Sequence, residues 1–231
     1  AYRVHDRLHE GDAAAFAAVA PSIRAIAASG ESKVPGALIA QLPALKIISV
    51  MGVGYDGIDV AAAKAQGVMV THTPDVLNDE VADTAIGLML CAARQFPAAD
   101  RYVRAGQWPQ GAMPLQTKMS GKRLGLVGMG RIAKAIAHRA LAFGMPIAYT
   151  ARSAKPELPY RYFPTPAALA AESDFLVVIT PGGAATRKLI DATVLKALGQ
   201  GRGNGYLINV ARGPVVDEAA LIEALENGTI A

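Results

Sequence analysis

The glycine-rich turn GMGRIA at 128–133 carries the clearest chemistry in the sequence. It follows an apolar run at 124–127 and precedes apolar residues at four-residue spacing, so we expect it to join a buried strand to a helix. In that setting Gly128 allows the tight turn, Gly130 lets a pyrophosphate approach the backbone, and small Ala133 lets helix and strand pack closely. The pattern predicts a dinucleotide site, and the alternative interpretation is an ordinary βα turn.

The residues after the next apolar run, 146–150, indicate which dinucleotide would bind. An NAD site usually ends this strand with Asp or Glu, but the sequence has no acidic residue between Gly128 and Glu157. Arg152 stands there instead, with Ser153 beside it, and a guanidinium at this position would bind a 2′-phosphate. We therefore predict NADP(H), with NAD(H) as the second candidate. A solvated basic loop is the alternative interpretation.

Three further loops follow strand-like runs. The Gly52-Val53-Gly54 turn could present successive backbone N–H groups to a carboxylate, and otherwise it is an ordinary loop. Arg212 follows the run 206–210, where an arginine can hold a carboxylate with two parallel bonds, and otherwise it is a surface arginine. The loop that begins at Thr180 could border a nicotinamide ring.

The apolar pattern places these loops in an α/β fold with two lobes and parallel sheets. The first lobe is predicted over 1–96 and the second, a dinucleotide-binding domain, over 97–231, with an irregular arm at 97–121. Strands are expected at 2–8, 23–28, 46–50, 68–71, 124–127, 146–150, 174–180 and 206–210. Helices are expected at 13–20, 37–42, 59–66, 77–96, 166–172, 191–198 and 217–227, besides the helix after the glycine-rich turn.

Composition narrows the function classes. The 231 residues are 52% apolar with a formal charge of +4, which suits one large or two modest globular domains. The basic residues form no stripe with aromatics, so nucleic acid is not an expected partner. The longest apolar run, 85–93, is too short to span a membrane. Single Cys91 cannot form an internal disulfide, and no His or Cys pair has metal-ligand spacing, so we expect a cytoplasmic protein without a metal site.

Three separated motifs resemble the D-isomer-specific 2-hydroxyacid dehydrogenases. They are GVGYDGID at 52–59, VGMGRIAKAIA at 127–137, and INVARG at 208–213 with VDE at 216–218. Within that family the sequence is most similar to the NADP-preferring glyoxylate/hydroxypyruvate reductases and to the hydroxyphenylpyruvate reductases. The resemblance implies two Rossmann-like lobes, a homodimer, and an oxidoreductase that reduces a small 2-oxo acid to the D-2-hydroxy acid with NADPH.

The resemblance also implies roles for single residues. Arg212 would be the catalytic arginine and would bind the substrate together with Met51, Gly52, Val53 and Gly54. The cofactor would contact Gly128, Met129, Gly130, Arg131 and Ile132 at its phosphates, Ala151, Arg152 and Ser153 at its adenosine ribose, and Thr180, Pro181, Thr186, Val210 and Ala211 towards the nicotinamide. Trp108 and Met113 in the arm would lie at the dimer interface.

One departure from the family pattern concerns the acid–base pair. The family uses a glutamate and a histidine after the arginine motif, whereas here no histidine follows His138 and the sequence ends at Ala231. The sequence is therefore expected to be truncated at both ends and inactive as it stands. A dinucleotide-sensing dimeric interaction protein of the same fold, without required turnover, is the alternative function. A methyltransferase would leave Arg152 and Arg212 unexplained.

Overall fold

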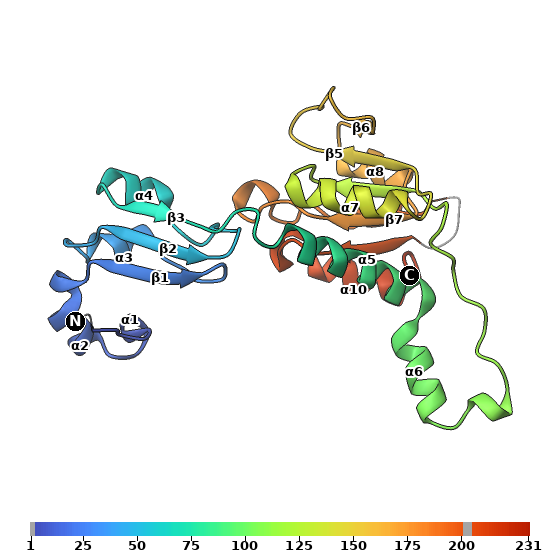
Figure 1. The fold of residues 1–231 in the computed structure, drawn as a ribbon, viewed down its shortest axis with the longest axis horizontal. Coiled ribbons are helices and arrows are strands. Elements are labelled where there is room, and N and C mark those ends of the chain that lie inside the picture. The colour runs from blue at the N-terminus through green and yellow to red at the C-terminus, as the bar shows by residue number, and fades with distance from the viewer. Residues whose placement is uncertain (1–2, 201–204) are drawn as a thin grey trace. The chain divides into compact units, whose positions relative to one another are not determined.

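The structure is a computed structural model that describes residues 3–200 and 205–231. The chain divides into two compact units, Ala1–Val76 and Leu77–Ala231, each built on a parallel sheet (Figure 1). This division lies earlier than the boundary predicted after residue 96. The reason is helix α5 (Asn78–Arg94), which buries Ala82, Ala85 and Met89 in the core of the second unit.

The first unit is a three-stranded parallel sheet in the order β1-β2-β3. Its strands are β1 (Ala25–Ser29), β2 (Ile47–Met51) and β3 (Met69–Thr71), and its helices are α1 (Leu8–Gly11), α2 (Ala13–Val19), α3 (Gly36–Ala40) and α4 (Val60–Ala65). Ile39, Leu42 and Ile48 are at most 1% exposed and form the centre of the core. The Asp59 carboxylate accepts from the Ala62 N–H at 2.9 Å and caps α4, as its position before an apolar run favours.

The strand predicted at 2–8 is wrong. Residue 2 lies outside the described residues, Arg3–His5 have no regular structure, and Leu8 begins the short helix α1. Alternating polar and apolar residues make a strand only where a neighbouring strand accepts the backbone hydrogen bonds. Val4 is 91% exposed, which shows that its apolar side chain has no core to face.

The second unit has five parallel strands in the order β6-β5-β4-β7-β8. The four strands predicted here are present as β4 (Leu124–Val127), β5 (Ile147–Thr150), β7 (Phe175–Val178) and β8 (Tyr206–Asn209). The edge strand β6 (Arg161–Phe163) was not predicted. The helices are α5, α6 (Phe96–Arg104), α7 (Arg131–Leu141), α8 (Pro166–Ala171), α9 (Ala192–Ala197) and α10 (Glu218–Glu226).

Side-chain alternation along the strands fills two cores, one on each face of this sheet. Leu124, Leu126 and Tyr149 face α5 and α7, whereas Val127 and Leu176 face α8, α9 and α10. Strands buried on both faces explain why 124–127 reads as an unbroken apolar run. Leu141 continues the four-residue spacing of Ala133 and Ala137 on α7, which predicts a buried position, but it is 51% exposed.

Ion pairs stabilise the second unit at positions other than the carboxyl ends of its strands. Just before β4, Arg123 donates two side-chain bonds to the Asp174 carboxylate, at 3.1 and 2.8 Å, and its amide donates a third at 2.8 Å. Burial alone would raise the pKa of Asp174, but these hydrogen bonds outweigh it and lower that pKa. Arg139 on α7 donates to Asp83 and Asp79 on α5. Both hydrogen bonds raise the pKa of its guanidinium, and the bond to Asp83 has the larger effect.

An arm leaves the sheet of the second unit, as Figure 1 shows in green. It consists of α6, the 3₁₀ turn Trp108–Gln110 and the irregular chain that returns to β4. Helix α6 has no buried residue, and Val103, Trp108 and Leu115 are 59, 58 and 102% exposed. The arm predicted at 97–121 is therefore present, and its first part is the helix α6. Within the described residues, no helix is both long enough and apolar enough to cross a membrane.

Candidate functional site

The carboxyl edge of the second sheet gathers the predicted cofactor residues of this unit. Strand β4 is central, with β5 and β6 on one side and β7 and β8 on the other, so the chain reverses its direction across the sheet between β4 and β7. Because every strand is parallel, the loops that begin at Gly128, Ala151, Ile179 and Val210 all leave the same edge. Open α/β sheets bind ligands at such a switch point.

Gly128 is a glycine for two independent reasons. Its φ is +101°, and an added Cβ would lie 2.5 Å from the carbonyl oxygen of Ile179 at the end of β7. Its N–H donates to the carbonyl of Thr150 at 2.9 Å, so the turn is also tied to β5. The predicted tight strand-to-helix turn is present, and it depends on close contact between two strand ends.

Gly130 is a glycine for a different reason. It is the N-cap of α7, provides no capping side chain, and has a φ of −88° that other residues adopt readily. An added Cβ would meet no atom within 4 Å, so the protein itself does not exclude a side chain there. The uncapped start of α7 carries the positive end of its dipole, and an anion could approach it directly.

The other residues of this turn divide into backbone and side-chain roles. The Met129 side chain is 3% exposed and packs in the core, so only its backbone is available to a ligand. Ala133 is fully buried, which confirms the predicted close packing of helix on strand. Ile132 packs partly against the same core, and the Arg131 side chain is exposed at the start of α7.

Arg152 lies in the loop after β5 and is exposed, as is Ser153. Among the residues that the structure describes, Arg152 makes no hydrogen bond or ion pair. The loop around it is held by two tyrosines: the Lys155 N–H donates to the Tyr149 hydroxyl at 2.6 Å, and the Tyr162 hydroxyl donates to the Ala151 carbonyl at 3.3 Å. A guanidinium on a tethered loop is suited to binding a phosphate.

The loop after β7 contains an unpaired polar atom. Thr180 Oγ1 is buried and has no hydrogen-bond partner within the described part of the chain. Its Cγ2 lies close to Gly128, so this side chain sits where the two strand ends meet. The Thr186 hydroxyl, in contrast, donates to the Pro181 carbonyl at 2.7 Å and thereby closes the loop on itself.

Arg212 lies in a loop that its neighbours fix. The Asn209 side chain donates to the Arg212 carbonyl and accepts from the Ala211 N–H, both at 3.0 Å. The Arg212 side chain donates from Nη1 to the Ala211 carbonyl at 3.0 Å and is partly buried. Asparagine at the strand end is therefore a positioning residue that the sequence prediction missed.

Asp217 immediately precedes α10, a position from which an aspartate side chain commonly caps a helix. It occupies the N-cap position but makes no side-chain hydrogen bond to the helix. Its carboxylate instead lies 3.2 Å from Lys188 Nζ, and its N–H donates to the Ile190 carbonyl. The helix begins where predicted, while the carboxylate ties the Arg212 loop to the segment after β7.

The residues present fit a dinucleotide. The uncapped start of α7, the open space beside Gly130 and the unpaired hydroxyl of Thr180 are all features that a bound ligand would satisfy. Within residues 3–200 and 205–231 there is no cluster of His, Cys, Asp or Glu that could hold a metal ion. The polar groups of this edge are suited to phosphates and carboxylates.

The first unit carries the second predicted site, the turn Gly52-Val53-Gly54 after β2. Gly52 has a φ of +148° and packs against Gly30, which lies at the end of β1. No hydrogen bond among the described residues uses the N–H of Val53 or of Gly54. Met51, at the end of the strand, is 77% exposed. The N–H groups of Val53 and Gly54 are therefore two neighbouring donors without a partner among the described residues, and their binding of a carboxylate stays a prediction.

The segment after β3 holds this turn in place. Thr73 Oγ1 accepts from the Gly52 N–H at 3.0 Å, and His72 Nδ1 lies 3.0 Å from the Val53 carbonyl oxygen. His72 is exposed although it makes this hydrogen bond. Thr73 was not singled out from the sequence, where its only signal is its position after a strand beside the glycine turn.

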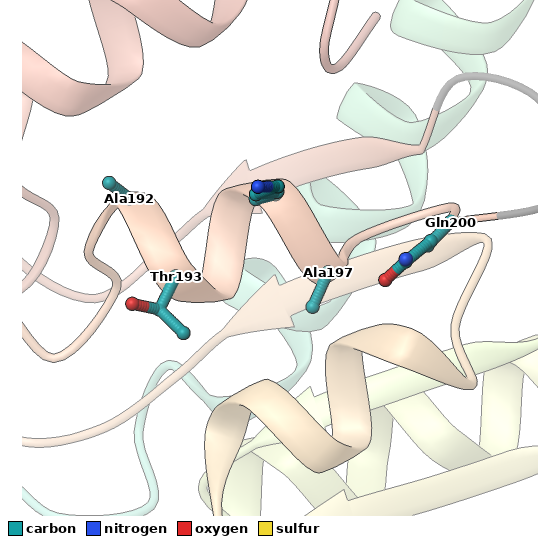
Figure 2. A pocket seen from close by; sticks show the side chains of 5 residues that line it. Ala192, Thr193, Ala197 and Gln200 are labelled. Carbon is teal, nitrogen blue, oxygen red and sulfur yellow. The ribbon is translucent and has the colours of Figure 1, made fainter.

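A surface depression on α9 is separate from these loops. Figure 2 shows its lining, which is Ala192, Thr193, Lys196, Ala197 and Gln200. It contains none of the predicted site residues, and its lining comes from α9 and the residues just after it.

Comparison with known proteins places the chain in a family. Residues 86–231 match the model of the NAD binding domain of the D-isomer specific 2-hydroxyacid dehydrogenases. The chain is 48% identical over 209 residues to a glyoxylate/hydroxypyruvate reductase A of Arabidopsis thaliana, a match that covers 90% of this chain and 66% of that protein. It is 46% identical over 211 residues to the hydroxyphenylpyruvate reductase of Plectranthus scutellarioides, covering 91% of this chain and 66% of the relative.

A solved structure agrees. The NADPH-dependent glyoxylate/hydroxypyruvate reductase of Sinorhizobium meliloti, crystallised with NADP and malonate, matches with a TM-score of 0.87 and 48% sequence identity. The match covers 95% of this chain and 68% of that one. The fold, the glycine-rich turn at the switch point and these relatives agree, and the chain belongs to the D-isomer specific 2-hydroxyacid dehydrogenase family.

Proposed function

We propose that the protein reduces a small 2-oxo acid, of the glyoxylate or hydroxypyruvate type, to the D-2-hydroxy acid with NADPH. Two of the relatives named above are glyoxylate/hydroxypyruvate reductases, and the third is a hydroxyphenylpyruvate reductase. The chain spans 66% of the length of the first two relatives, so the activity is proposed for the whole protein. NADH is the second candidate for the cofactor.

The observation that carries the proposal is the set of groups on the carboxyl edge of the second sheet. The uncapped N-terminus of α7 binds the diphosphate, with Gly130 leaving room for it. Arg152 at the end of β5 binds the 2′-phosphate, which distinguishes NADPH from NADH. Thr180 gains a partner for its buried hydroxyl. When bound, the nicotinamide would supply the hydride to C2 of the 2-oxo acid, and the carbonyl oxygen would take its proton from the acid–base histidine that the family resemblance implies.

The substrate is held through its charge. In the first unit, the N–H groups of Val53 and Gly54 are the proposed donors to a carboxylate. Arg212, in the second unit, would donate to the carboxylate and carbonyl oxygen of the acid. Negative charge develops on that oxygen during reduction, so a fixed cation stabilises the transition state more than the ground state. The Asn209 bonds keep the Arg212 loop in one shape before substrate arrives, which avoids a cost of ordering it later.

We also propose a homodimer formed through the arm. Trp108 and Leu115 are large apolar side chains on a segment that projects from the sheet, and α6 buries none of its residues. Large apolar side chains exposed on one projecting segment are consistent with an interaction surface. Met113, which was predicted at the same interface, is half-buried.

Turnover by the full-length protein tests the proposed function. Oxidation of NADPH is followed at 340 nm with glyoxylate or hydroxypyruvate as substrate, for the wild type and for Arg212→Ala. Removing a single donor to a developing oxyanion typically lowers kcat by about 10²–10³-fold, and we expect that range here. The variant Arg212→Lys retains the charge but not the two-pronged geometry, and should recover part of the loss.

Two results would contradict the proposal. A wild-type protein that binds NADPH but reduces neither acid would favour a dinucleotide-sensing role. Near-normal turnover by Arg212→Ala would remove the arginine from the catalytic machinery.

A further inference from the structure

The turn proposed to bind the substrate carboxylate is held from one side by the segment after β3. Gly52 exchanges two hydrogen bonds with Thr73: its N–H donates to Thr73 Oγ1, and its carbonyl accepts from the Thr73 N–H, both at 3.0 Å. The His72 ring adds a third bond to the Val53 carbonyl at 3.0 Å. A carbonyl oxygen only accepts, so His72 donates from a protonated Nδ1. These three bonds leave the N–H groups of Val53 and Gly54 available.

We infer that Thr73 and His72 are positioning residues that keep the Gly52-Val53-Gly54 turn in the shape in which both free N–H groups can bind one carboxylate. The inference rests on the proposed function, in which a 2-oxo acid binds at this turn. According to this inference, Thr73 and His72 contribute to the affinity for the acid without contacting the acid themselves.

The turn needs such support because its own packing is weak. Gly52 has a φ of +148° and meets Gly30, so the contact is made between two residues that have no side chain. Glycine is the residue with the greatest backbone freedom, and a turn built on it is ordered only by the bonds it makes. The paired bonds to Thr73 are therefore the main constraint on the conformation of Gly52.

The His72 ring is itself held. Tyr55, one residue beyond the turn, packs edge-on against it with ring centroids 4.9 Å apart and an interplanar angle of 63°. An aromatic pair in this geometry is favourable, and it keeps Nδ1 directed at the Val53 carbonyl. The turn is thus linked at Gly52 by the Thr73 hydroxyl and at Val53 by a ring that Tyr55 supports.

Substitutions at Thr73 separate the hydroxyl from the shape of the side chain. Thr73→Val removes the acceptor for the Gly52 N–H and preserves the volume, whereas Thr73→Ser keeps the acceptor. Thr71→Val is a matched control, because Thr71 is the last residue of β3, two residues before Thr73, and its hydroxyl makes no hydrogen bond among the described residues. His72→Ala removes the second link without altering β3.

The experiment measures the full-length protein in two ways. Steady-state kinetics give kcat and KM for glyoxylate and KM for NADPH, and calorimetry in the presence of NADP gives the Kd of malonate, an unreactive dicarboxylate. One lost hydrogen bond changes an equilibrium by about 3–10-fold, so Thr73→Val should raise KM for glyoxylate and the Kd of malonate by that factor. We expect kcat and KM for NADPH to stay within about twofold, since ground-state binding of the acid is what changes.

The controls fix the interpretation. Thr73→Ser and Thr71→Val should match the wild type. His72→Ala should weaken the binding of glyoxylate and malonate but not of NADPH, as Thr73→Val does. If Thr73→Val fails to fold by circular dichroism, His72→Ala carries the test, because the exposed ring is not part of the core. Unchanged KM and Kd in the foldable variants, or an equal rise in Thr71→Val, would overturn the inference.

Failure of the proposed function gives a different pattern. A wild type that binds malonate but reduces no 2-oxo acid would refute the reductase, while weaker malonate binding in Thr73→Val would still support the positioning role. A wild type that binds no malonate would overturn the inference as well.

Discussion

Replacing Gly128 or Gly130 of the same turn by alanine should affect two different properties, the stability of the fold in the first case and cofactor binding in the second. At Gly128 the added methyl would lie 2.5 Å from the Ile179 carbonyl oxygen, whereas ordinary van der Waals contact begins at 3.4 Å, and the φ of +101° is itself unfavourable. At Gly130 the methyl meets nothing within 4 Å and φ is −88°. Gly128→Ala should therefore destabilise the fold, and Gly130→Ala should impair only cofactor binding.

The magnitudes follow from these geometries. A residue in a rarely populated backbone conformation costs about 1–3 kcal/mol, and an overpacked contact costs about 1–3 kcal/mol more, so Gly128→Ala should lose about 2–6 kcal/mol of unfolding free energy. Alanine is a poorer N-cap than glycine, which should cost Gly130→Ala less than about 1 kcal/mol. If its methyl displaces the diphosphate from one charge-assisted hydrogen bond, NADPH affinity falls by about 10–150-fold.

Urea unfolding followed by far-UV circular dichroism measures the first quantity, and NADPH fluorescence titration measures the second. Gly144→Ala is the control for backbone conformation alone, because Gly144 has a φ of +64° and nothing within 4 Å of an added Cβ. It should lose about 1–2 kcal/mol, the cost of a left-handed residue without a clash. If Gly128→Ala is no less stable than Gly144→Ala, or if Gly130→Ala binds NADPH like the wild type, the reasoning about the turn is refuted.

Three further predictions follow from other groups. Arg152→Ala should lower the affinity for NADPH by about 10–100-fold and leave the affinity for NADH within about twofold of the wild type, because only NADPH has a 2′-phosphate for this guanidinium. Equal losses of affinity in titrations with both cofactors would contradict the assignment. Asp174 has a lowered pKa in the folded protein, so its contribution to stability is present above its ordinary pKa of 3.8 and is lost as pH falls through the folded value; urea unfolding at several pH values should show this acid-linked loss in the wild type and not in Asp174→Asn. Leu115→Asp should convert the proposed dimer to a monomer in light-scattering measurements, and an unchanged mass would exclude this part of the arm from the interface.

The sequence was most informative where local pattern and packing agree. Strand β4 was located from four apolar residues bounded by Arg123 and Gly128, because a strand buried on both faces must be apolar throughout. Strand β6, Arg161–Phe163, was missed because three residues at a sheet edge carry no such run, and only pairing with β5 makes them a strand. The opposite error at 2–8 has the same cause, since an alternating pattern without a neighbouring strand does not form a sheet.

The sequence indicated the loops that carry the candidate site residues, but not the contacts that support those loops. Gly128, Gly130, Arg152 and Arg212 each follow a strand run, and parallel strands bring such positions in the second unit to one edge. The contacts that hold these loops could not be predicted, because they join residues that are distant in sequence or that have many partners to choose from. Thr73 is one example, since only the register of β2 and β3 places its hydroxyl against Gly52.

The burial of Met129 affects how well ordered the glycine-rich turn at 128–133 is before a ligand binds. Its thioether side chain occupies the core between the sheet and α5 and α7, so the peptide units on either side of it are anchored by hydrophobic packing and not by the anion they would bind. A preorganised turn loses little entropy on binding. Shortening the Met129 side chain should therefore lower the affinity of the turn for a phosphate, although the substitution removes no polar atom of the turn.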